Sequence, residues 1–206
     1  MNNKLDISVV VPLYNEAESL PELVAWIDRV AVSHGYAYEV ILVDDGSSDG
    51  SWEVVESLRE KSPAIRGIGF ARNYGKSAAL YCGFAAAEGE VVITMDADLQ
   101  DPPELVDRML QYWVEGYDDI YAKRRNRGEE SWMRRRLSLA FYSILQKMSR
   151  IDILPNVGDF RLLDRRCVLT LRHLREQERY TKGLFCWIGY RKKSIEFDRG
   201  DRLAGH

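Results

Sequence analysis

The strongest constraint on the fold is a repeating order of apolar runs and helical segments. Runs rich in β-branched residues lie at residues 7–11, 40–43, 65–70 and 91–95. Each is followed by turn residues and then by a helical pattern, at residues 16–33, 51–61, 76–87 and 102–115. Strands that alternate with helices predict a mainly parallel sheet covered by helices on both faces. The sequence therefore predicts a single α/β domain that spans residues 1–206. Beyond the fourth helix we expect a strand at 119–122, a basic amphipathic segment at 131–150, a strand at 158–163 and a helix at 177–187.

Charge is distributed unevenly along the chain, although the net formal charge is only −3. Residues 1–120 carry 8 Lys and Arg against 22 Asp and Glu, whereas residues 121–206 carry 21 against 10. The acidic half suits a bound cation, and the basic half suits an anionic partner such as phosphate or a membrane surface. The alternative is ordinary solvated faces. Nucleic-acid binding is disfavoured because the acidic half would repel a polyanion. The 3 cysteines show no paired short spacing, so neither a disulfide framework nor a zinc site is expected.

Two aspartates follow the fourth apolar run directly. Asp96 and Asp98 flank one small residue at the point where the predicted strand ends. Ligands bind at the carboxyl ends of the strands in sheets of this kind. Two carboxylates there can hold Mg²⁺ or Mn²⁺ together with the phosphates of a nucleotide. The alternative is a pair of surface turn residues, because Asp-x-Asp arises often by chance, but the position after a buried strand favours a metal site.

A second acidic turn follows the second apolar run. Asp44 and Asp45 open into a Gly-Ser-Ser-Asp-Gly stretch, where carboxylates could accept hydrogen bonds from a nucleobase or a ribose. A turn followed by a helix cap would explain the same residues, because Asp49 and Ser51 are both good N-caps. A Gly-x-Gly-x-x-Gly motif is absent, and so is a phosphate-binding Gly-Lys-Ser/Thr loop with its upstream glycine, so dinucleotide enzymes and ATPases are disfavoured.

Five motifs occur in a fixed order along the chain. They begin at Val10, Val43, Arg72, Met95 and Gly158 and read Val-Val-Pro-Leu-Tyr-Asn-Glu, Val-Asp-Asp-Gly-Ser, Arg-Asn-Tyr-Gly-Lys, Met-Asp-Ala-Asp-Leu-Gln-Asp-Pro-Pro and Gly-Asp-Phe-Arg-Leu. Together they resemble the inverting family-2 glycosyltransferases of GT-A fold, which is Rossmann-like. More narrowly, they resemble the dolichol-phosphate mannose synthase branch and its bacterial polyprenyl-phosphate (bactoprenol) glucosyltransferases. The resemblance implies transfer of one sugar from a UDP- or GDP-sugar to undecaprenyl or dolichyl phosphate, for glycan, lipopolysaccharide or cell-envelope modification.

The resemblance also assigns roles to residues at matching positions. It implies that Pro12, Tyr14, Glu16 and Asp45 surround the nucleobase and ribose, with Asp44 beside them. It implies that Asp96, Asp98 and Gln100 hold the metal, Mg²⁺ or Mn²⁺, and through it the diphosphate. It matches Arg202 to a phosphate-binding arginine, although this chain has Gly205 and His206 where the family continues with Ser-Lys. Residues 1–120 would then form the nucleotide-sugar and metal half, and residues 121–206 the half that faces the acceptor and membrane.

Asp159 is the third expected catalytic carboxylate, beside Asp96 and Asp98. A lipid phosphate is already anionic at neutral pH, so it does not require a base to become nucleophilic. Asp159 is therefore expected to orient the acceptor or to complete the metal surroundings. The alternative is a strand residue paired with Arg161 or with a nearby helix cap.

The acceptor phosphate needs a positively charged binding site, and a basic stretch directly follows the strand predicted at 119–122. We expect Arg124, Arg125 and Arg127 to grip the lipid phosphate, since guanidinium groups bind phosphate in a bidentate way. The segment at 131–150 suits the interface of an anionic membrane. The alternative is a core-facing helix with a solvated basic face.

Two other functions stay open at this stage. A same-fold enzyme could glycosylate a soluble or polysaccharide acceptor, or the chain could be a nucleotide-sugar-binding or membrane-binding module without turnover. Many members of the family that the motifs resemble have C-terminal membrane helices, which this sequence lacks. It is therefore expected to be either part of a longer protein, integral if the chain continues past residue 206, or a peripheral protein at the cytoplasmic side of the cell membrane. A homo-oligomer is left open.

Overall fold

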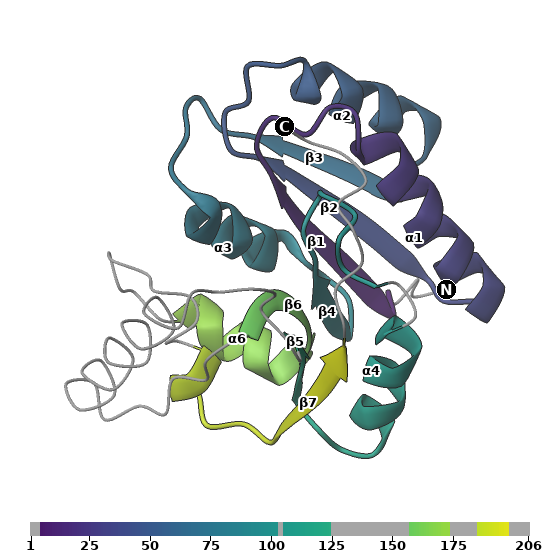
Figure 1. The fold of residues 1–206 in the computed structure, drawn as a ribbon, viewed down its shortest axis with the longest axis vertical. Helices are drawn as coiled ribbons and strands as arrows, with labels where there is room; N and C mark the ends of the chain where they lie inside the picture. The colour runs from purple at the N-terminus through teal and green to yellow at the C-terminus, as the bar shows by residue number, and fades with distance from the viewer. Residues whose placement is uncertain (1–4, 103–104, 125–156, 174–184, 198–206) are drawn as a thin grey trace, which may run out of the picture.

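One sheet of seven strands forms the centre of the structure, a computed structural model that describes residues 5–102, 105–124, 157–173 and 185–197 (Figure 1). The strands are β1 (Ile7–Leu13), β2 (Tyr38–Asp44), β3 (Ile65–Gly69), β4 (Val91–Thr94), β5 (Asp119–Arg124), β6 (Val157–Asp164) and β7 (Lys192–Phe197). They lie in the order β3-β2-β1-β4-β6-β5-β7. β6 is antiparallel to both of its neighbours, β4 and β5, whereas all other neighbouring strands are parallel. The predicted mainly parallel sheet is confirmed.

Helices cover both faces of this sheet. On one face lie α1 (Leu20–His34), α2 (Ser51–Lys61) and α4 (Leu105–Val114). On the other face lie α3 (Lys76–Ala86) and α6 (Arg165–His173). The strand-helix alternation of the first 120 residues therefore folds into the predicted sandwich.

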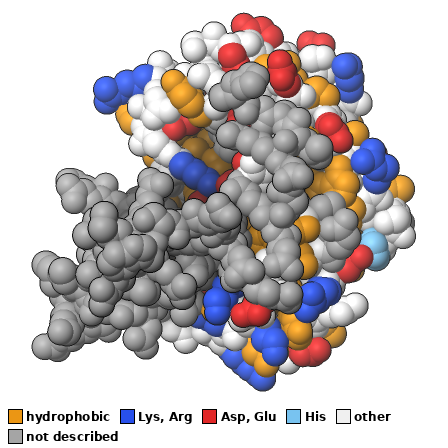
Figure 2. Space-filling model, viewed as in Figure 1, with side chains coloured by type: hydrophobic (Ala, Val, Ile, Leu, Met, Phe, Trp, Pro, Cys, Tyr) orange, Lys and Arg blue, Asp and Glu red, His pale blue; other side chains and the backbone are white. Residues whose placement is uncertain are grey.

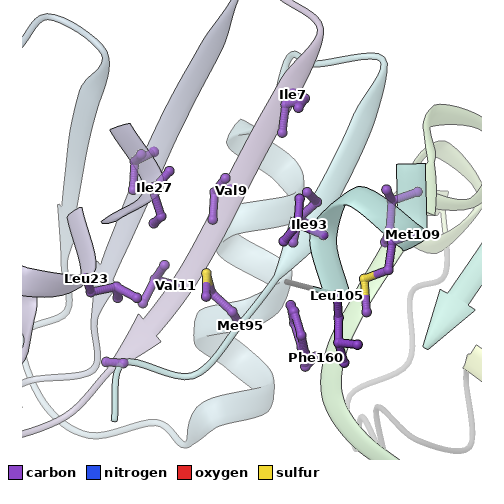
Figure 3. Packing of buried hydrophobic residues seen from close by; sticks show 14 of the residues in the cluster. Ile7, Val9, Val11, Leu23, Ile27, Ile93, Met95, Leu105, Met109 and Phe160 are labelled. Atoms are coloured by element: carbon purple, nitrogen blue, oxygen red, sulfur yellow. The ribbon is translucent and has the colours of Figure 1, made fainter. Parts of the chain in front are cut away.

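The larger apolar core lies between the sheet and the helices α1 and α4. Figure 3 shows Ile7, Val9 and Val11 of β1 in this core, with side chains from α1, β4, α4 and β6 packed around them. The intervening Val10 points to the opposite face, where it meets α3: a Cβ added to Gly83 would lie 2.2 Å from Cγ1 of Val10. All seven residues of β1 are buried because both faces of the strand are covered, which explains why all but Ser8 are apolar. The hydroxyl of Ser8 donates to Glu39 Oε1 at 2.6 Å.

The structure departs from the sequence prediction at the start of α1 and in the second half of the chain. α1 begins at Leu20 rather than at residue 16, because residues 16–19 form a turn in which Ser19 Oγ donates to the Glu16 carbonyl at 3.1 Å. α6 and β7 were not predicted. The segment at 131–150 and most of the helix expected at 177–187 lie outside the described residues.

The described helices are all too short or too polar to cross a lipid bilayer.

Candidate active site

A cavity of about 370 Å³ opens at the carboxyl ends of β1, β2 and β4. Its walls are formed by Pro12, Leu13, Tyr14, Glu16, Asp45, Asn73, Gly75, Lys76, Asp96, Ala97 and Asp98. Six residues that the sequence singled out are thus brought together: Pro12, Tyr14, Glu16, Asp45, Asp96 and Asp98. The cavity therefore lies where ligands bind in open α/β sheets, outside the strand ends.

The loops that follow β1 and β2 are held together by hydrogen bonds. The N–H of Asn15 donates to Ser47 Oγ at 2.9 Å, and the N–H of Ser48 donates to Asn15 Oδ1 at 2.9 Å. The N–H of Ala17 donates to Asp49 Oδ2 at 3.2 Å. Asn15 itself has a left-handed backbone with φ 56°, which asparagine tolerates better than most residues. These contacts fix both loops relative to each other at the cavity mouth.

Asp45 holds a third loop, the one that leads into α3. Its carboxylate is 4% exposed and accepts the N–H of Tyr74 at 2.7 Å and the N–H of Gly75 at 2.9 Å. The next residue, Gly46, has φ +75°, and a Cβ there would lie 2.5 Å from the carbonyl carbon of Arg72. Only glycine allows this close approach of the two loops. Asp45 therefore shapes the cavity wall in addition to lining it.

Asp44 is turned toward its own loop. Its Oδ1 accepts the N–H of Ser47 at 3.1 Å and the hydroxyl of Ser47 at 2.5 Å. Asp44 is 4% exposed and is not among the described residues that line the cavity. The hydrogen bonds match the alternative of a turn-forming aspartate.

The loop after β4 folds back on itself. The N–H of Asp96 donates to Asp101 Oδ2 at 3.1 Å, and the N–H of Gln100 donates to Asp98 Oδ1 at 3.2 Å. Leu99 has a left-handed backbone with φ 57°, which is unusual for a residue with a branched side chain. This turn keeps the acidic side chains of the loop close to one another.

Negative charge is concentrated in this loop. Burial and then the charge of Asp96 raise the pKa of Asp101 to about 7, with a smaller contribution from the charge of Asp98. A raised pKa means that the carboxylate form is disfavoured where other carboxylates already lie. A bound cation would relieve this repulsion.

Asp159 meets the same loop from the neighbouring strand. The antiparallel register of β4 and β6 pairs Thr94 with Arg161, and its continuation by two residues places Asp159 opposite Asp96. The hydroxyl of Thr94 donates to the carbonyl of Asp159, which fixes the backbone at this point. The expected third carboxylate thus lies beside the other two.

Lys76 joins two of these carboxylates. Its Nζ lies 2.5 Å from Asp96 Oδ1 and 2.7 Å from Asp159 Oδ2. Burial acts to lower the pKa of Lys76, but the charges of Asp96 and Asp159 outweigh it and raise that pKa above its ordinary value. Lys76 belongs to the motif that begins at Arg72, but no role was predicted for it. Its position directly after Gly75, as the first residue of α3, could have indicated that it lies at the strand ends.

Asp159 and Arg161 each contact a different charged residue: Lys76 for Asp159, and Asp119 for Arg161. Arg161 is 3% exposed, and its Nη1 lies 3.3 Å from Asp119 Oδ1 on β5. Its guanidinium carbon lies 3.7 Å from the centre of the Phe185 ring. Arg161 thus has a carboxylate partner on the adjacent strand β5, and Asp159 has an ammonium partner on α3.

The residues present fit a divalent cation only in part. In the described part of the chain, no three Asp, Glu, His or Cys side chains form a ready metal site. Asp96 and Asp98 supply hard oxygens to one cavity. Gln100 is not among the described residues that line the cavity, but its Oε1 is buried with no hydrogen-bond partner among the described residues. Two carboxylates and an amide suit an ion that takes its remaining ligands from a substrate.

Several expected acceptor residues cannot be placed. Arg125, Arg127, Arg202 and the segment 131–150 lie outside the described residues, and only the backbone of Arg124 is described, at the end of β5. In the view of Figure 2, basic side chains gather at the lower end, near β7 and α4, with acidic ones among them.

Comparison with known sequences gives a consistent result. The sequence model described as glycosyl transferase family 2 matches residues 8–171. An uncharacterized glycosyltransferase of Synechocystis is 41% identical over 201 residues, which is 98% of this chain and 63% of that protein. A bactoprenol glucosyl transferase of Shigella phage SfV is 34% identical over 201 residues, 98% of this chain and 66% of that protein. The chain thus spans less than two thirds of the length of these relatives.

Solved structures resemble the fold at low sequence identity. A mannosyltransferase from Pyrobaculum calidifontis, in complex with GDP-Man and Mn²⁺, matches with a TM-score of 0.66 and 20% identity over 98% of this chain and 58% of that one. A glucosyl-3-phosphoglycerate synthase from Mycobacterium tuberculosis, in complex with Mn²⁺, UDP-glucose and phosphoglyceric acid, matches with a TM-score of 0.63 and 19% identity over 98% of this chain and 73% of that one. These likenesses identify the fold as that of nucleotide-sugar glycosyltransferases.

Proposed function

The chain belongs to glycosyl transferase family 2, and from this premise we propose that it moves one sugar from a UDP- or GDP-sugar to a polyprenyl phosphate. The observation that carries the proposal is the convergence of Asp45, Asp96 and Asp98 on one cavity at the strand ends. The bactoprenol glucosyl transferases among its relatives support a polyprenyl phosphate as the acceptor. The reaction would serve glycan, lipopolysaccharide or cell-envelope modification.

The donor would occupy the cavity described above. Pro12, Tyr14 and Glu16 would surround the base and ribose from the β1 side, and Asp45 from the β2 side. The ring of Tyr14 is 47% exposed at the cavity, so an aromatic surface is available to a flat base. The carboxylate of Asp45 already accepts two backbone N–H groups, so any contact with a ribose hydroxyl would use its remaining lone pairs.

A divalent cation, Mg²⁺ or Mn²⁺, would be held by Asp96 and Asp98, with Gln100 as a further oxygen. When bound, it would stabilise the negative charge that develops on the departing diphosphate. The two similar structures described above are complexes with Mn²⁺, which supports a divalent cation of this kind. Asp96 and Asp98 suit the task because their backbone is fixed by the folded loop and is in place before the substrate arrives.

The acceptor would attack from the side of β6. A phosphate monoester has a second pKa of about 6, so at neutral pH it is mostly a dianion and its oxygens are nucleophilic without help from a base. Asp159 would then orient the acceptor rather than remove a proton, and a single displacement inverts the anomeric configuration. Arg124, Arg125 and Arg127 would neutralise the acceptor phosphate, and Arg202 would contact a phosphate of the donor. The protein would work at the cytoplasmic side of the cell membrane, at the membrane surface.

A nucleotide-release assay tests this proposal. The protein is incubated with a panel of UDP- and GDP-sugars, with Mn²⁺ or Mg²⁺, and with or without undecaprenyl phosphate in detergent. We expect release of UDP or GDP that depends on both the cation and the lipid. Release that depends on the cation but not on the lipid would be transfer of the sugar to water, and would count against the lipid as the acceptor. Binding of a donor without any release would indicate a binding module.

A further inference from the structure

Lys76 stands where a cation is expected to bind. Among the described residues that line the cavity it is the one with a positive charge. Its Nζ lies 2.5 Å from Asp96 Oδ1, so the ammonium and an incoming divalent ion would share one carboxylate. The second contact, at 2.7 Å to Asp159 Oδ2, anchors the ammonium between the two strands.

In this arrangement the ammonium of Lys76 and a bound divalent cation would repel each other. A unit charge and a divalent charge a few ångströms apart repel each other, although the Lys76 side chain is 43% exposed and water weakens this repulsion. Asp96 has a side chain that is 33% exposed and Asp159 one that is 15% exposed, so water screens this repulsion only in part. The divalent ion must therefore bind against the charge of Lys76 for as long as the cavity holds no other anion.

We propose that Lys76 makes cation binding conditional on the donor: the cation binds weakly to the empty cavity and tightly only when a nucleoside diphosphate brings in further negative charge. This inference rests on the proposed function, since it takes Asp96 and Asp98 as the cation ligands. Two phosphates add enough anionic charge to accommodate Lys76 and the divalent ion together. Lys76 is thus a positioning residue that couples the two ligands and keeps Asp159 in register with Asp96.

The test is a measurement of Mn²⁺ binding that needs no turnover. Free Mn²⁺ is followed by electron paramagnetic resonance in the wild type and in the neutral variants Lys76→Met and Lys76→Gln. Each protein is titrated first without nucleotide and then with UDP or GDP, with correction for Mn²⁺ held by nucleotide alone. Lys61→Met, at the far end of α2, is the matched control because it also removes one positive charge.

Without nucleotide, we expect both neutral variants to bind Mn²⁺ about ten- to a hundredfold more tightly than the wild type, because a repelling charge has been removed. Nucleotide should tighten Mn²⁺ binding strongly in the wild type and much less in these variants. Lys76→Arg retains the charge and should stay close to the wild type. A mere loss of structure would weaken Mn²⁺ binding, so the expected change has the opposite sign.

The outcomes separate this inference from the proposed function. If Lys76→Met and Lys76→Gln bind Mn²⁺ no more tightly than the wild type and Lys61→Met, the inference is wrong while the cation site stands. If the wild type binds no Mn²⁺ even with nucleotide, the cation site of the proposed function is wrong, and the inference falls with it. Asp98→Asn in the Lys76→Met background should remove the tight binding, and tight binding that persists there would place the ion elsewhere and overturn the inference.

Discussion

The N–H of Gly75 donates to Asp45 Oδ2 at 2.9 Å, so a carboxylate at the end of β2 fixes the loop that leads into α3. Asp45→Ala would leave the N–H groups of Tyr74 and Gly75 without their acceptor. We expect a loss of about 1–3 kcal/mol in the free energy of unfolding, since water reaches the exposed Tyr74 and replaces part of the bonding. Urea unfolding measures the loss, and hydrogen exchange should show faster exchange at the amides of Tyr74 and Gly75. Unchanged exchange at both amides would contradict the role given to Asp45.

Asp98→Ala should abolish transfer while the protein stays folded. The carboxylate is proposed to act on charge that develops only as the donor bond breaks, so its loss should lower kcat by about a thousandfold or more. The measurement is the lipid-dependent release of nucleotide, with circular dichroism as a check on folding. Glu60→Gln on the exposed face of α2 is the control, because it removes a carboxylate away from the cavity. Turnover at the wild-type rate in Asp98→Ala would refute the assignment.

Arg124→Ala should weaken binding of the acceptor more than binding of the donor. Arg124 ends β5, and β5 ends at the same edge of the sheet as β4. Loss of one guanidinium–phosphate contact should raise KM for undecaprenyl phosphate about tenfold or more, with donor affinity nearly unchanged. Initial rates measured against lipid and donor concentration separate the two effects, and Arg59→Ala on α2 is the control. An unchanged dependence on lipid concentration would remove Arg124 from the acceptor site.

The buried pair of Asp119 and Arg161 predicts a non-additive double mutant. Asp119→Leu leaves the guanidinium of Arg161 buried without its carboxylate, which should cost about 3–5 kcal/mol in the free energy of unfolding. Asp119→Leu combined with Arg161→Met removes both charges and should be more stable than the single Asp119→Leu variant. Urea unfolding of the two single variants and the double variant gives the coupling energy. Strict additivity would show that the two charges do not interact.

Asp164 predicts part of the acid sensitivity of the fold. Burial alone would raise its pKa, but hydrogen bonds from Trp113 Nε1 at 2.8 Å and from the N–H of Arg166 at 2.8 Å, together with the charge of Arg166, lower it. A lowered folded pKa contributes stability above the unfolded value of about 3.9, and this contribution is lost as the pH falls through the folded pKa.

Asp164→Asn removes that contribution, so its deficit in the free energy of unfolding relative to wild type should be largest near pH 7 and should shrink below about pH 4. Urea unfolding at several pH values measures it, with Glu60→Gln as the control. A deficit that stays constant down to about pH 3 would show that the charge of Asp164 contributes nothing.

The sequence was sufficient for the parts of the fold that depend on local pattern. The helix at 51–61 has the predicted bounds, because Asp49 and Gly50 mark its start and the Asp49 carboxylate accepts the N–H of Ser51 at 3.0 Å. The helix predicted from residue 16 begins only at Leu20. Residues 16–19 form a turn instead, and hydrogen bonds to Asp49 and Ser51 hold Glu16 and Ala17 in place. Tertiary hydrogen bonds of this kind have no signature in the periodicity.

For the candidate site, the sequence placed carboxylates at strand ends but not their partners. The convergence of Asp45, Asp96 and Asp98 followed from a rule about parallel sheets. The contact of Lys76 with Asp96 and Asp159 depends on how α3 packs and on the antiparallel direction of β6. Asp44 was predicted to bind the nucleotide, but in the structure its carboxylate accepts hydrogen bonds from Ser47. The sequence alone does not distinguish a carboxylate bonded to its own loop from one that is open to a ligand.

The antiparallel pairing of β5 and β6 places Lys123 directly across from Val157, so the chain leaves the sheet and returns to it at neighbouring points on the cavity edge. A stretch of chain fastened at two adjacent anchors can be lengthened, shortened or exchanged without moving any strand. The loops after β1 and β2 and the loop that leads into α3 cannot change length as easily, because each is tied to the next by hydrogen bonds. Under the proposed function, acceptor contacts could therefore change in this part of the chain while Asp96 and Asp98 stay in place.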